Sequence, residues 1–552
     1  MRSLVRRIGL GTLIGLACCG EPPSVEPAIV PPGAASTPEE RVEPSVVRPA
    51  AAATDACDTP LACARIIAAF IKNPEQRASV LSRIGAAHAA NGAGERALEI
   101  ADGLRDHAHA HIELLVAIAA SAPGGLDGAR AREVLAIAVA AADAADRRPV
   151  PMTSESWPTM RERLARWTAE RYLEHGRLAE SADMADGAAW RERVPLLLKI
   201  AARHETDAAA RLAALDRAAG AIALDEPWAC IAVAQGYFAA RRPGQGYTLL
   251  RHAAAAARES ADELISRDRA CLGDVAAAYV AADHRSKTSH RRNGVGVRRA
   301  TALARVREDD ECASSLLEAL ATAGEDTALA AVLRERPDLR GPFASGLLAL
   351  AARVRGQRQR EAAHLAAFRR DLRREPEPEP RVAAWIALAS LYRRSGFVAE
   401  ARGLLDQAAP VVRALDDRDA RDLALRDLAE AEAEAGRCGR AVALARDQDD
   451  PSYTLAQIAE KCPDHAAIAV LLAARPLIRW SDRRSQFLAA LVRRLGARGE
   501  LRRALELVAE IEVPETRASA LIDLHTPWAR AKDPATASLL QRTIDSSNLD
   551  PD

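Results

Sequence analysis

Three alternating histidines are the first side chains in this sequence whose type and spacing suggest chemistry. His107, His109 and His111 lie within five residues, and His107 and His111 would share one face of a helix. Imidazole is a common zinc ligand, and a zinc site needs three or four protein ligands. No cysteine or further histidine lies nearby, and Asp106 and Glu113 would add only weak ligands. We therefore expect polar side chains at a junction of two helices, and no metal site.

The strongest run of positive charge lies between Asp283 and Arg299. Such a run would suit acidic lipids, phosphate groups or an acidic partner. No aromatic residue is interleaved with these charges, so a base-stacking platform for nucleic acid is missing. We interpret the run as a solvated loop between two helices.

The sequence contains only partial matches to catalytic and cofactor-binding motifs. Arg299 stands at the third glycine position of a dinucleotide fingerprint that would start at Gly294, and no strand precedes it. His204 and Glu205 lack the second histidine of a zinc-protease helix, because Ala208 stands there. No phosphate-binding loop or nucleophile elbow occurs. The sequence thus predicts no catalytic residue, no cofactor and no enzyme; an active site in a groove of a helical scaffold is the alternative.

The N-terminus has the pattern of an export signal. Basic residues at Arg2, Arg6 and Arg7 precede an apolar run over residues 8–17, which is too short to span a bilayer. Residues 14–18, Ile-Gly-Leu-Ala-Cys, resemble a bacterial lipobox. That resemblance implies a lipoprotein signal peptide over residues 1–17 and lipidation of Cys18; an ordinary cleaved signal is the alternative. Because no aspartate follows Cys18, we expect an outer-membrane anchor that faces the periplasm.

The next segment cannot bury a core. Residues 18–55 are rich in Pro, Ala, Ser, Glu and Val and lack helical periodicity. We expect a disordered tether between the lipid and a folded body over residues 56–552.

Composition indicates that this body is helical. Of the 552 residues, 49% are apolar and only 3% aromatic, and alanine, the best helix former, dominates the apolar set. Lys+Arg and Asp+Glu are both 76, so the basic excess of a general nucleic-acid binder is absent.

One helical hairpin recurs, most clearly over residues 381–410. Trp385, Leu388 and Tyr392 share one helix face, Gly396 would end that helix, and a stripe of small and apolar residues follows. This order of residues resembles the tetratricopeptide repeat. Related copies have their turn at Gly92, Gly176, Gly356, Gly436 and Gly499.

The period of the copies is close to 40 residues. Cys230, Cys271 and Cys312 are 41 residues apart and precede equivalent helix stripes. The usual tetratricopeptide period is 34, and HEAT-like arrays, the structural alternative, run about 40–47 residues. The recurring glycine turn favours the first reading. The expected fold is an all-α superhelical solenoid of stacked antiparallel helix pairs, with a concave groove.

The resemblance implies that first helices line the groove and bind extended peptides or helices of other proteins. Family positions fall here on Ile386, Ser390, Arg393, Arg394, Arg426, Glu430 and Glu434. The peptide-carboxylate clamp of some family members needs lysine and asparagine where Ile386 and Ser390 stand, so we do not expect that binding mode. Plain solvation of these charges is the alternative.

Export places the cysteines in an oxidising compartment, where disulfides persist. Cys57 and Cys63 flank the start of the body, and Cys438 and Cys462 fall at the same end of two antiparallel helices. We expect these two pairs to be disulfides. Cys230, Cys271 and Cys312 fit small buried hydrophobes.

Together these patterns predict a lipid-anchored scaffold or adaptor of the bacterial cell envelope that binds other proteins or peptides, contacts the membrane through its lipid and binds no nucleic acid. An assembly factor without a discrete ligand is a third possibility.

Overall fold

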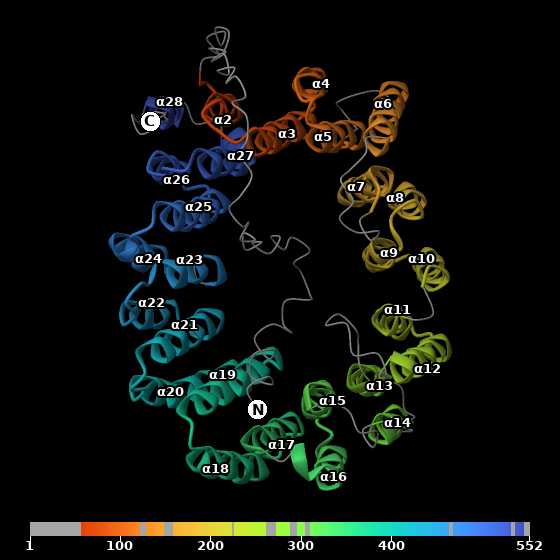
Figure 1. Ribbon diagram of the computed structural model, residues 1–552, viewed down its shortest axis with the longest axis vertical. Coiled ribbons are helices and arrows are strands. Elements are labelled where there is room, and N and C mark those ends of the chain that lie inside the picture. Colours follow the sequence, from red (N-terminus) through yellow and green to blue (C-terminus); the bar gives the residue numbers. More distant parts are fainter. Residues whose placement is uncertain are drawn as a thin grey trace, which may run out of the picture.

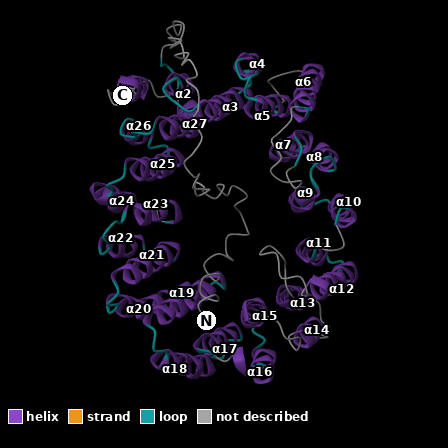
Figure 2. Ribbon diagram, in the orientation of Figure 1, coloured by secondary structure: helices purple, strands orange, loops and turns teal. Residues whose placement is uncertain are grey.

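A computed structural model of the chain describes residues 57–121, 128–147, 158–222, 226–260, 272–286, 295–303, 310–339, 341–462, 467–531 and 536–545. Within these ranges the regular structure is helical, and no strand occurs (Figure 2). The signal peptide, Cys18, the tether and Cys271 lie outside the described residues.

The helices follow one another with short connections. The first third of the chain contains α2 (Pro60–Ala68), α3 (Pro74–Ala90), α4 (Gly94–Asp102), α5 (Ala108–Ala120), α6 (Gly128–Asp146), α7 (Met160–Glu174), α8 (Leu178–Ala185), α9 (Trp190–Arg203) and α10 (Ala208–Gly220). The middle contains α11 (Pro227–Ala239), α12 (Pro243–Ser260), α13 (Leu272–Ser286), α14 (Val295–Leu303), α15 (Asp310–Thr322), α16 (Asp326–Glu335), α17 (Pro342–Val354) and α18 (Arg358–Arg374). The last part contains α19 (Pro378–Arg394), α20 (Val398–Arg413), α21 (Arg418–Glu434), α22 (Cys438–Arg446), α23 (Ser452–Lys461), α24 (Ile468–Ala474), α25 (Ser481–Ala497), α26 (Leu501–Val508), α27 (Pro514–Ala531) and α28 (Ala537–Asp545).

A left-handed residue ends the first helix of most hairpins. Gly396 has a φ of 85°, and the residue after it donates from its backbone nitrogen to the carbonyl of Tyr392 at 2.9 Å. This 6→1 bond defines a Schellman motif, in which glycine avoids the steric cost of positive φ. The same turn joins α3 to α4, α7 to α8, α15 to α16, α17 to α18, α21 to α22 and α25 to α26. In the α11–α12 hairpin the position is held by Arg241, at a φ of 59°.

The hairpins form two concentric layers (Figure 1). The first helices α3, α5, α7 and so on to α27 form the inner layer, and each contacts the next along the chain. The second helices form the outer layer and pack behind their own partners. Antiparallel pairing buries the apolar stripe of each helix, which gives the all-α solenoid of stacked helix pairs that the sequence predicts.

The solenoid closes on itself, which the sequence patterns do not predict. Instead of an open superhelix with a groove, the chain forms a ring in which α27 packs against α3 (Figure 1). Among the described helices, the outer partner of α27 is α2, from the other end of the described chain, which packs against it as closely as partners do within a hairpin. α28 contacts both α2 and α26. The ring is therefore closed by a composite hairpin, α27 with α2.

Polar contacts hold this seam, the junction of α2, α3, α27 and α28. Arg83 of α3 donates to Ser519 of α27 at 2.6 Å and lies 3.6 Å from Asp523. Arg517 is fully buried and donates to the carbonyls of Ile511 (2.5 Å) and Thr543 (3.2 Å). A buried guanidinium that satisfies backbone carbonyls on both sides fixes the position of α28 against α27.

The apolar core follows the inner layer around the ring. Phe368 and Trp385 meet edge to face with ring centres 4.7 Å apart. Tyr392, on the predicted stripe, is buried and donates to Glu361 of α18 at 3.2 Å, and Tyr237 donates to Asp216 of α10 at 2.5 Å. Each of these tyrosines ties an inner helix to the preceding outer helix.

The proline-rich stretch 375–380 contributes its second half to α19, which begins at Pro378. Proline fits the first turn of a helix because the amide it lacks has no intrahelical partner there.

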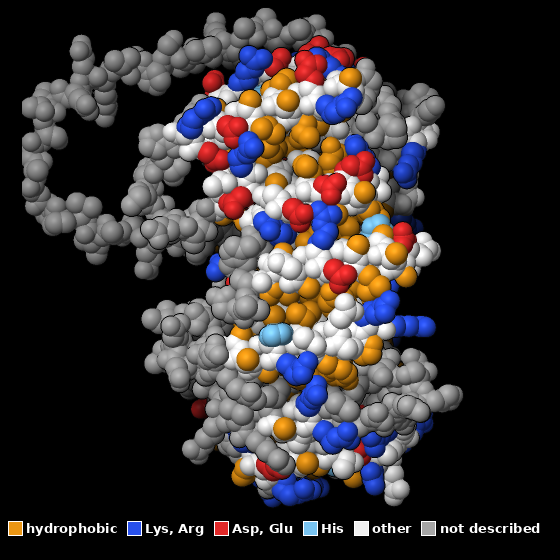
Figure 3. All heavy atoms as spheres, turned by 90° about the vertical axis from the view of Figure 1, so that its right-hand side faces the viewer, with side chains coloured by type: hydrophobic (Ala, Val, Ile, Leu, Met, Phe, Trp, Pro, Cys, Tyr) orange, Lys and Arg blue, Asp and Glu red, His pale blue; other side chains and the backbone are white. Residues whose placement is uncertain are grey.

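The surface is mixed in charge. On the outer face in Figure 3, acidic and basic side chains are interspersed with exposed apolar groups. Within the described ranges, no helix combines the length and apolarity that crossing a bilayer requires.

Candidate partner-binding surface

The inner face of the ring carries the residues that the repeat resemblance singled out. Ser390, Arg393 and Arg394 lie on α19, and Arg426, Glu430 and Glu434 lie on α21. All six keep part of their surface accessible, on the helix sides that are not packed against neighbouring helices. The hairpin architecture thus positions them on one continuous wall.

Several of these charges pair with one another across helices. Arg393 Nη2 lies 2.8 Å from Glu434 Oε2, and Lys461 Nζ at the end of α23 lies 2.6 Å from Glu430 and 3.6 Å from Glu434. The carboxylates raise the pKa of Lys461 above its ordinary value although burial opposes this. The opposite charges of neighbouring repeats therefore form a shared network, and they are not independent contacts for a ligand.

The ion pairs continue around the inner layer. Arg394 reaches Glu318 of α15 at 3.4 Å, where burial raises the pKa of the Glu318 carboxyl despite the nearby guanidinium. On the other side, Arg493 of α25 lies 3.3 Å from Glu460 and 4.0 Å from Asp523, which also pairs with Arg83. The network therefore reaches the seam. A shallow hollow between α23 and α25 is lined by Ala459, Glu460, Ala490, Arg493, Arg494 and Ala497.

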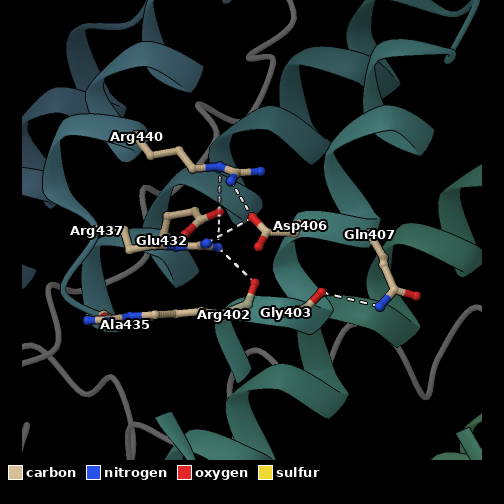
Figure 4. Close-up of polar contacts among 8 residues, drawn as sticks. All are labelled: Arg402, Gly403, Asp406, Gln407, Glu432, Ala435, Arg437 and Arg440. Atoms are coloured by element: carbon tan, nitrogen blue, oxygen red, sulfur yellow. Dashed lines mark hydrogen bonds and ion pairs between the residues drawn. The ribbon is translucent and has the colours of Figure 1, made fainter. Parts of the chain in front are cut away.

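A second network lies where three hairpin elements meet and is structural in character (Figure 4). Glu432 of α21 is fully buried and pairs with Arg437 and Arg440, which both also reach Asp406 of α20. Arg402 donates twice to the Ala435 carbonyl, at 2.7 and 2.9 Å. These contacts join α20 to the α21–α22 turn.

The aromatic strip, defined here as Leu423, Arg426, Tyr453, Arg483 and Trp480, was not predicted from the sequence. Arg426 and Arg483 approach the Tyr453 ring from neighbouring repeats, with Cζ 5.8 and 5.2 Å from its centre. Leu423 lies one turn before Arg426 on α21, and Trp480 lies one turn before Arg483 at the start of α25. The strip therefore crosses three consecutive inner helices.

Large apolar surface is exposed along this strip. The exposed fractions are 51% for Leu423, 41% for Tyr453 and 63% for Trp480. Trp480 donates its Nε1 to Asp450 at 2.6 Å, which fixes one edge of the indole and leaves the ring accessible. Aromatic residues and arginine dominate the energetics of protein interfaces. The available sequence signal was that Tyr453 stands outside the apolar stripe of α23 and that Trp480 stands just before the first residue of α25.

The three histidines do not converge. His111 is buried with its Nδ1 2.7 Å from the Ala101 carbonyl, and His107 lies 3.2 Å from Glu75. His109 meets Trp167 edge to face at 4.6 Å, and burial lowers its pKa. In the part of the chain that the structure describes, no three His, Cys, Asp or Glu side chains form a metal-binding group.

Both expected cysteine pairs are disulfide-bonded. The Cα atoms are 4.8 Å apart in Cys57–Cys63 and 5.9 Å apart in Cys438–Cys462. The first pair lies at the seam, where Cys57 Sγ is 3.2 Å from the Leu540 carbonyl oxygen. Cys230 is a buried free thiol whose pKa burial raises to about 11.

The basic run is described only at its two ends, which belong to α13 up to Ser286 and to α14 from Val295, because residues 287–294 lie outside the described ranges. Arg299 is exposed, with its Cζ 5.6 Å from the ring of Tyr247 and 5.8 Å from that of Tyr279.

The fold and this inner wall define a closed all-α helical-repeat ring. No protein-family profile and no curated protein matches the sequence. Similar solved structures include Ton1535 from Thermococcus onnurineus NA1, at 14% identity and a TM-score of 0.23, covering 65% of this chain and 98% of that one. Human IFIT1, in a dimer with PPP-AAAA, matches at 10% identity and a TM-score of 0.21, covering 86% and 95%. A circular tandem repeat protein matches at 13% identity and a TM-score of 0.15, covering 88% and 96%. These TM-scores are low, so the class rests on the helix pairs and their closure.

Proposed function

We propose that this protein is an adaptor ring of the bacterial cell envelope that binds a segment of another protein along its inner face. The aromatic strip is the observation that carries the proposal. It presents an aromatic pair, two guanidinium groups and a leucine, all accessible, on three consecutive inner helices. Residues of these types bury large area at little entropic cost when a partner covers them.

The inner wall around the strip is less suited to binding a partner than the strip itself. Many neighbouring charges are paired, as Arg393 is with Glu434 and Lys461 with Glu430, and within the strip Arg426 lies 3.3 Å from Asp427, so the exposed rings and Leu423 distinguish the strip from the wall. These half-buried charges already have partners, so they add little to the affinity for a ligand. A partner therefore gains most of its binding energy at the strip, and the paired charges around it select for register and orientation.

The location proposed for the ring rests on the sequence of its N-terminus. Lipidation of Cys18 would tether the ring to a membrane, and residues 18–55 would separate the two. We place the protein on the outer membrane, facing the periplasm, where its disulfides persist. The proposal includes no cofactor, no catalytic step and no nucleic-acid partner.

Affinity capture from cross-linked envelopes tests the binding function. Wild-type protein is compared with Tyr453→Ala/Arg483→Glu and with the control Arg502→Glu, which changes a side chain 79% exposed on the outer helix α26. We expect specific envelope proteins with the wild type and the control, and roughly tenfold less with the strip variant, as a loss of about 1.4 kcal/mol would give. Equal capture by all three proteins would contradict binding at the strip.

Lipidation has a separate test. Wild-type cells labelled with a palmitate analogue should show label on the protein in the outer-membrane fraction. Cys18→Ala should lose both the label and the membrane association. Label retained in that variant would exclude Cys18 as the lipid site.

A further inference from the structure

The side chains of the aromatic strip favour a particular kind of ligand. Tyr453 and Trp480 present accessible aromatic surface, and the guanidinium groups of Arg426 and Arg483 lie over the Tyr453 ring, 5.8 and 5.2 Å from its centre. Aromatic faces bind proline rings, because an extended polyproline segment is already ordered and loses little entropy on docking. Guanidinium groups bind carboxylates through paired hydrogen bonds. The complementary ligand is an extended segment in which prolines and glutamates lie close together.

The chain carries such segments ahead of its first described helix. Residues 21–27 read Glu-Pro-Pro-Ser-Val-Glu-Pro, and residues 42–49 read Val-Glu-Pro-Ser-Val-Val-Arg-Pro. Between residues 20 and 50 there are five glutamates and two arginines, so the stretch has a negative balance. Its charge and its prolines therefore match the guanidinium and aromatic groups of the strip.

The segment can reach the strip from where it joins the ring. Cys57 is fixed at the seam beside Leu540 of α28, and α27, α25 and α23 follow one another along the inner layer. Neighbouring helices lie about 10 Å apart, so the strip begins roughly 10–30 Å from the seam. Twenty-nine residues separate Pro27 from Cys57, and a linker of that length has a reach of about 30 Å. A tethered segment at such a distance has an effective concentration near the millimolar range, so weak contacts suffice for occupancy.

We propose that residues 21–49 bind the aromatic strip of their own chain, with prolines against Tyr453 and Trp480 and glutamates against Arg426 and Arg483. The segment then competes with any outside partner for the inner face. This inference rests on the proposed function in using the same strip as the binding surface. It adds a built-in competitor that a partner must displace.

A photo-crosslinking residue in the full chain tests the inference. p-Benzoylphenylalanine replaces Tyr453, which keeps an aromatic ring at the strip, and replaces Arg502 on α26 as the control position. Purified protein, with Cys18→Ala to prevent lipidation, is irradiated and the crosslinked peptides are identified by mass spectrometry. We expect position 453 to crosslink to residues 21–49 at the mass of a single chain, and position 502 not to do so.

Substitutions in the segment supply the matched comparison. Pro22→Ala/Pro23→Ala/Pro27→Ala with Glu21→Gln/Glu26→Gln should reduce the crosslink about tenfold, whereas Ser24→Ala and Ser36→Ala should leave it unchanged. Adding a synthetic peptide of residues 20–49 should reduce the crosslink, and its proline-to-alanine version should not. These steps change the segment and not the ring, so misfolding of the ring cannot produce the result.

Other outcomes overturn the inference. Crosslinks between two chains, shown by mixing isotope-labelled and unlabelled protein, would mean that a second copy occupies the strip. Crosslinks within the ring alone, or to the segment regardless of its prolines, would exclude the docking proposed here. In whole envelopes, crosslinks from position 453 to another protein without any to residues 21–49 would preserve the adaptor function and reject this inference. Crosslinks from position 453 to residues 21–49 and to no other protein would support this inference and reject the adaptor function.

Discussion

Arg437 contacts both carboxylate oxygens of Glu432, which is buried between the packed helices. Arg437 Nε lies 2.5 Å from Oε2, and Nη2 donates to Oε1 at 2.7 Å, while the Glu432 side chain is fully buried. Glu432 lies four residues before its turn glycine, where the hairpin around Gly396 has Tyr392. Burial raises the pKa of the Glu432 carboxyl, and the arginines oppose that shift.

Breaking this pair should destabilise the ring strongly. Arg437→Ala leaves a buried carboxylate with fewer partners, and removal of one member of such a pair costs about 3–5 kcal/mol. We expect a clear fall in the urea midpoint of unfolding. The control Glu506→Gln removes the exposed pair with Arg502, for which about 0–1 kcal/mol is expected. Similar midpoints for the two variants would refute a structural role for the buried pair.

Closure of the ring depends on α2. Ile67 is fully buried in α2, whereas Ala69, two residues later, is exposed. Ile67→Glu should detach α2 from α27 because a carboxylate is costly to bury. Small-angle scattering should then show a larger radius of gyration and retained helical content by circular dichroism. Ala69→Glu should scatter like the wild type. An unchanged radius for Ile67→Glu would show that α2 does not close the ring.

Backbone conformation predicts how three glycine substitutions change stability: one should destabilise the protein and two should stabilise it. Gly396→Ala should destabilise by about 1 kcal/mol, because alanine at positive φ is strained. Arg241→Gly should stabilise by up to about 1 kcal/mol by relieving the same strain. Gly403→Ala in α20, where a Cβ meets nothing within 4 Å, should also stabilise, by about 1 kcal/mol, through helix propensity. Thermal unfolding of the three variants measures the order; destabilisation by Arg241→Gly would be inconsistent with this account.

The seam should weaken in acid. The pKa of His88 in α3 is lowered to about 4, first by burial and then by the nearby Arg96, His525 and Arg65. Burial also lowers the pKa of His525. Because the folded ring holds these imidazoles neutral, the unfolded chain binds more protons below its histidine pKa of about 6.5. Stability contributed by the neutral form is therefore present above that pH and is lost as the pH falls towards 4.

His88→Tyr tests this dependence, since tyrosine occupies the equivalent position before the turn in α7, α11 and α19. The melting temperature of the wild type should drop more between pH 7 and pH 4.5 than that of the variant. Parallel curves for the two proteins would assign the acid sensitivity to other groups.

The disulfide Cys438–Cys462 should contribute more than Cys57–Cys63. The chain-entropy relation gives about 3 kcal/mol for the separation of 24 residues and about 2 kcal/mol for the separation of 6. Paired cysteine-to-alanine variants, compared by urea unfolding, should follow that order. Mass spectrometry without reductant should show both bonds in the wild type, and a free thiol at any of the four cysteines would contradict the pairing.

The sequence by itself determined the local units of this protein. Trp385, Leu388, Tyr392 and Gly396 define a hairpin because helix periodicity and the cap conformation act over only a few residues. The repeat resemblance implied that Ser390 and Arg393 on one first helix and Arg426 on the next face a partner, and the antiparallel run of neighbouring helices put Cys438 near Cys462.

Only the tertiary structure decided how the units meet. The α27–α2 pairing joins segments about 450 positions apart in the sequence, and closure depends on small rotations that add up over all the repeats. A local sequence pattern therefore cannot predict whether the ring closes. The aromatic strip arises in the same way, because Arg426, Tyr453 and Arg483 come together only after three inner helices have packed side by side. The buried partner of Glu432 likewise depends on the close approach of α20, α21 and α22, which their packed side chains set.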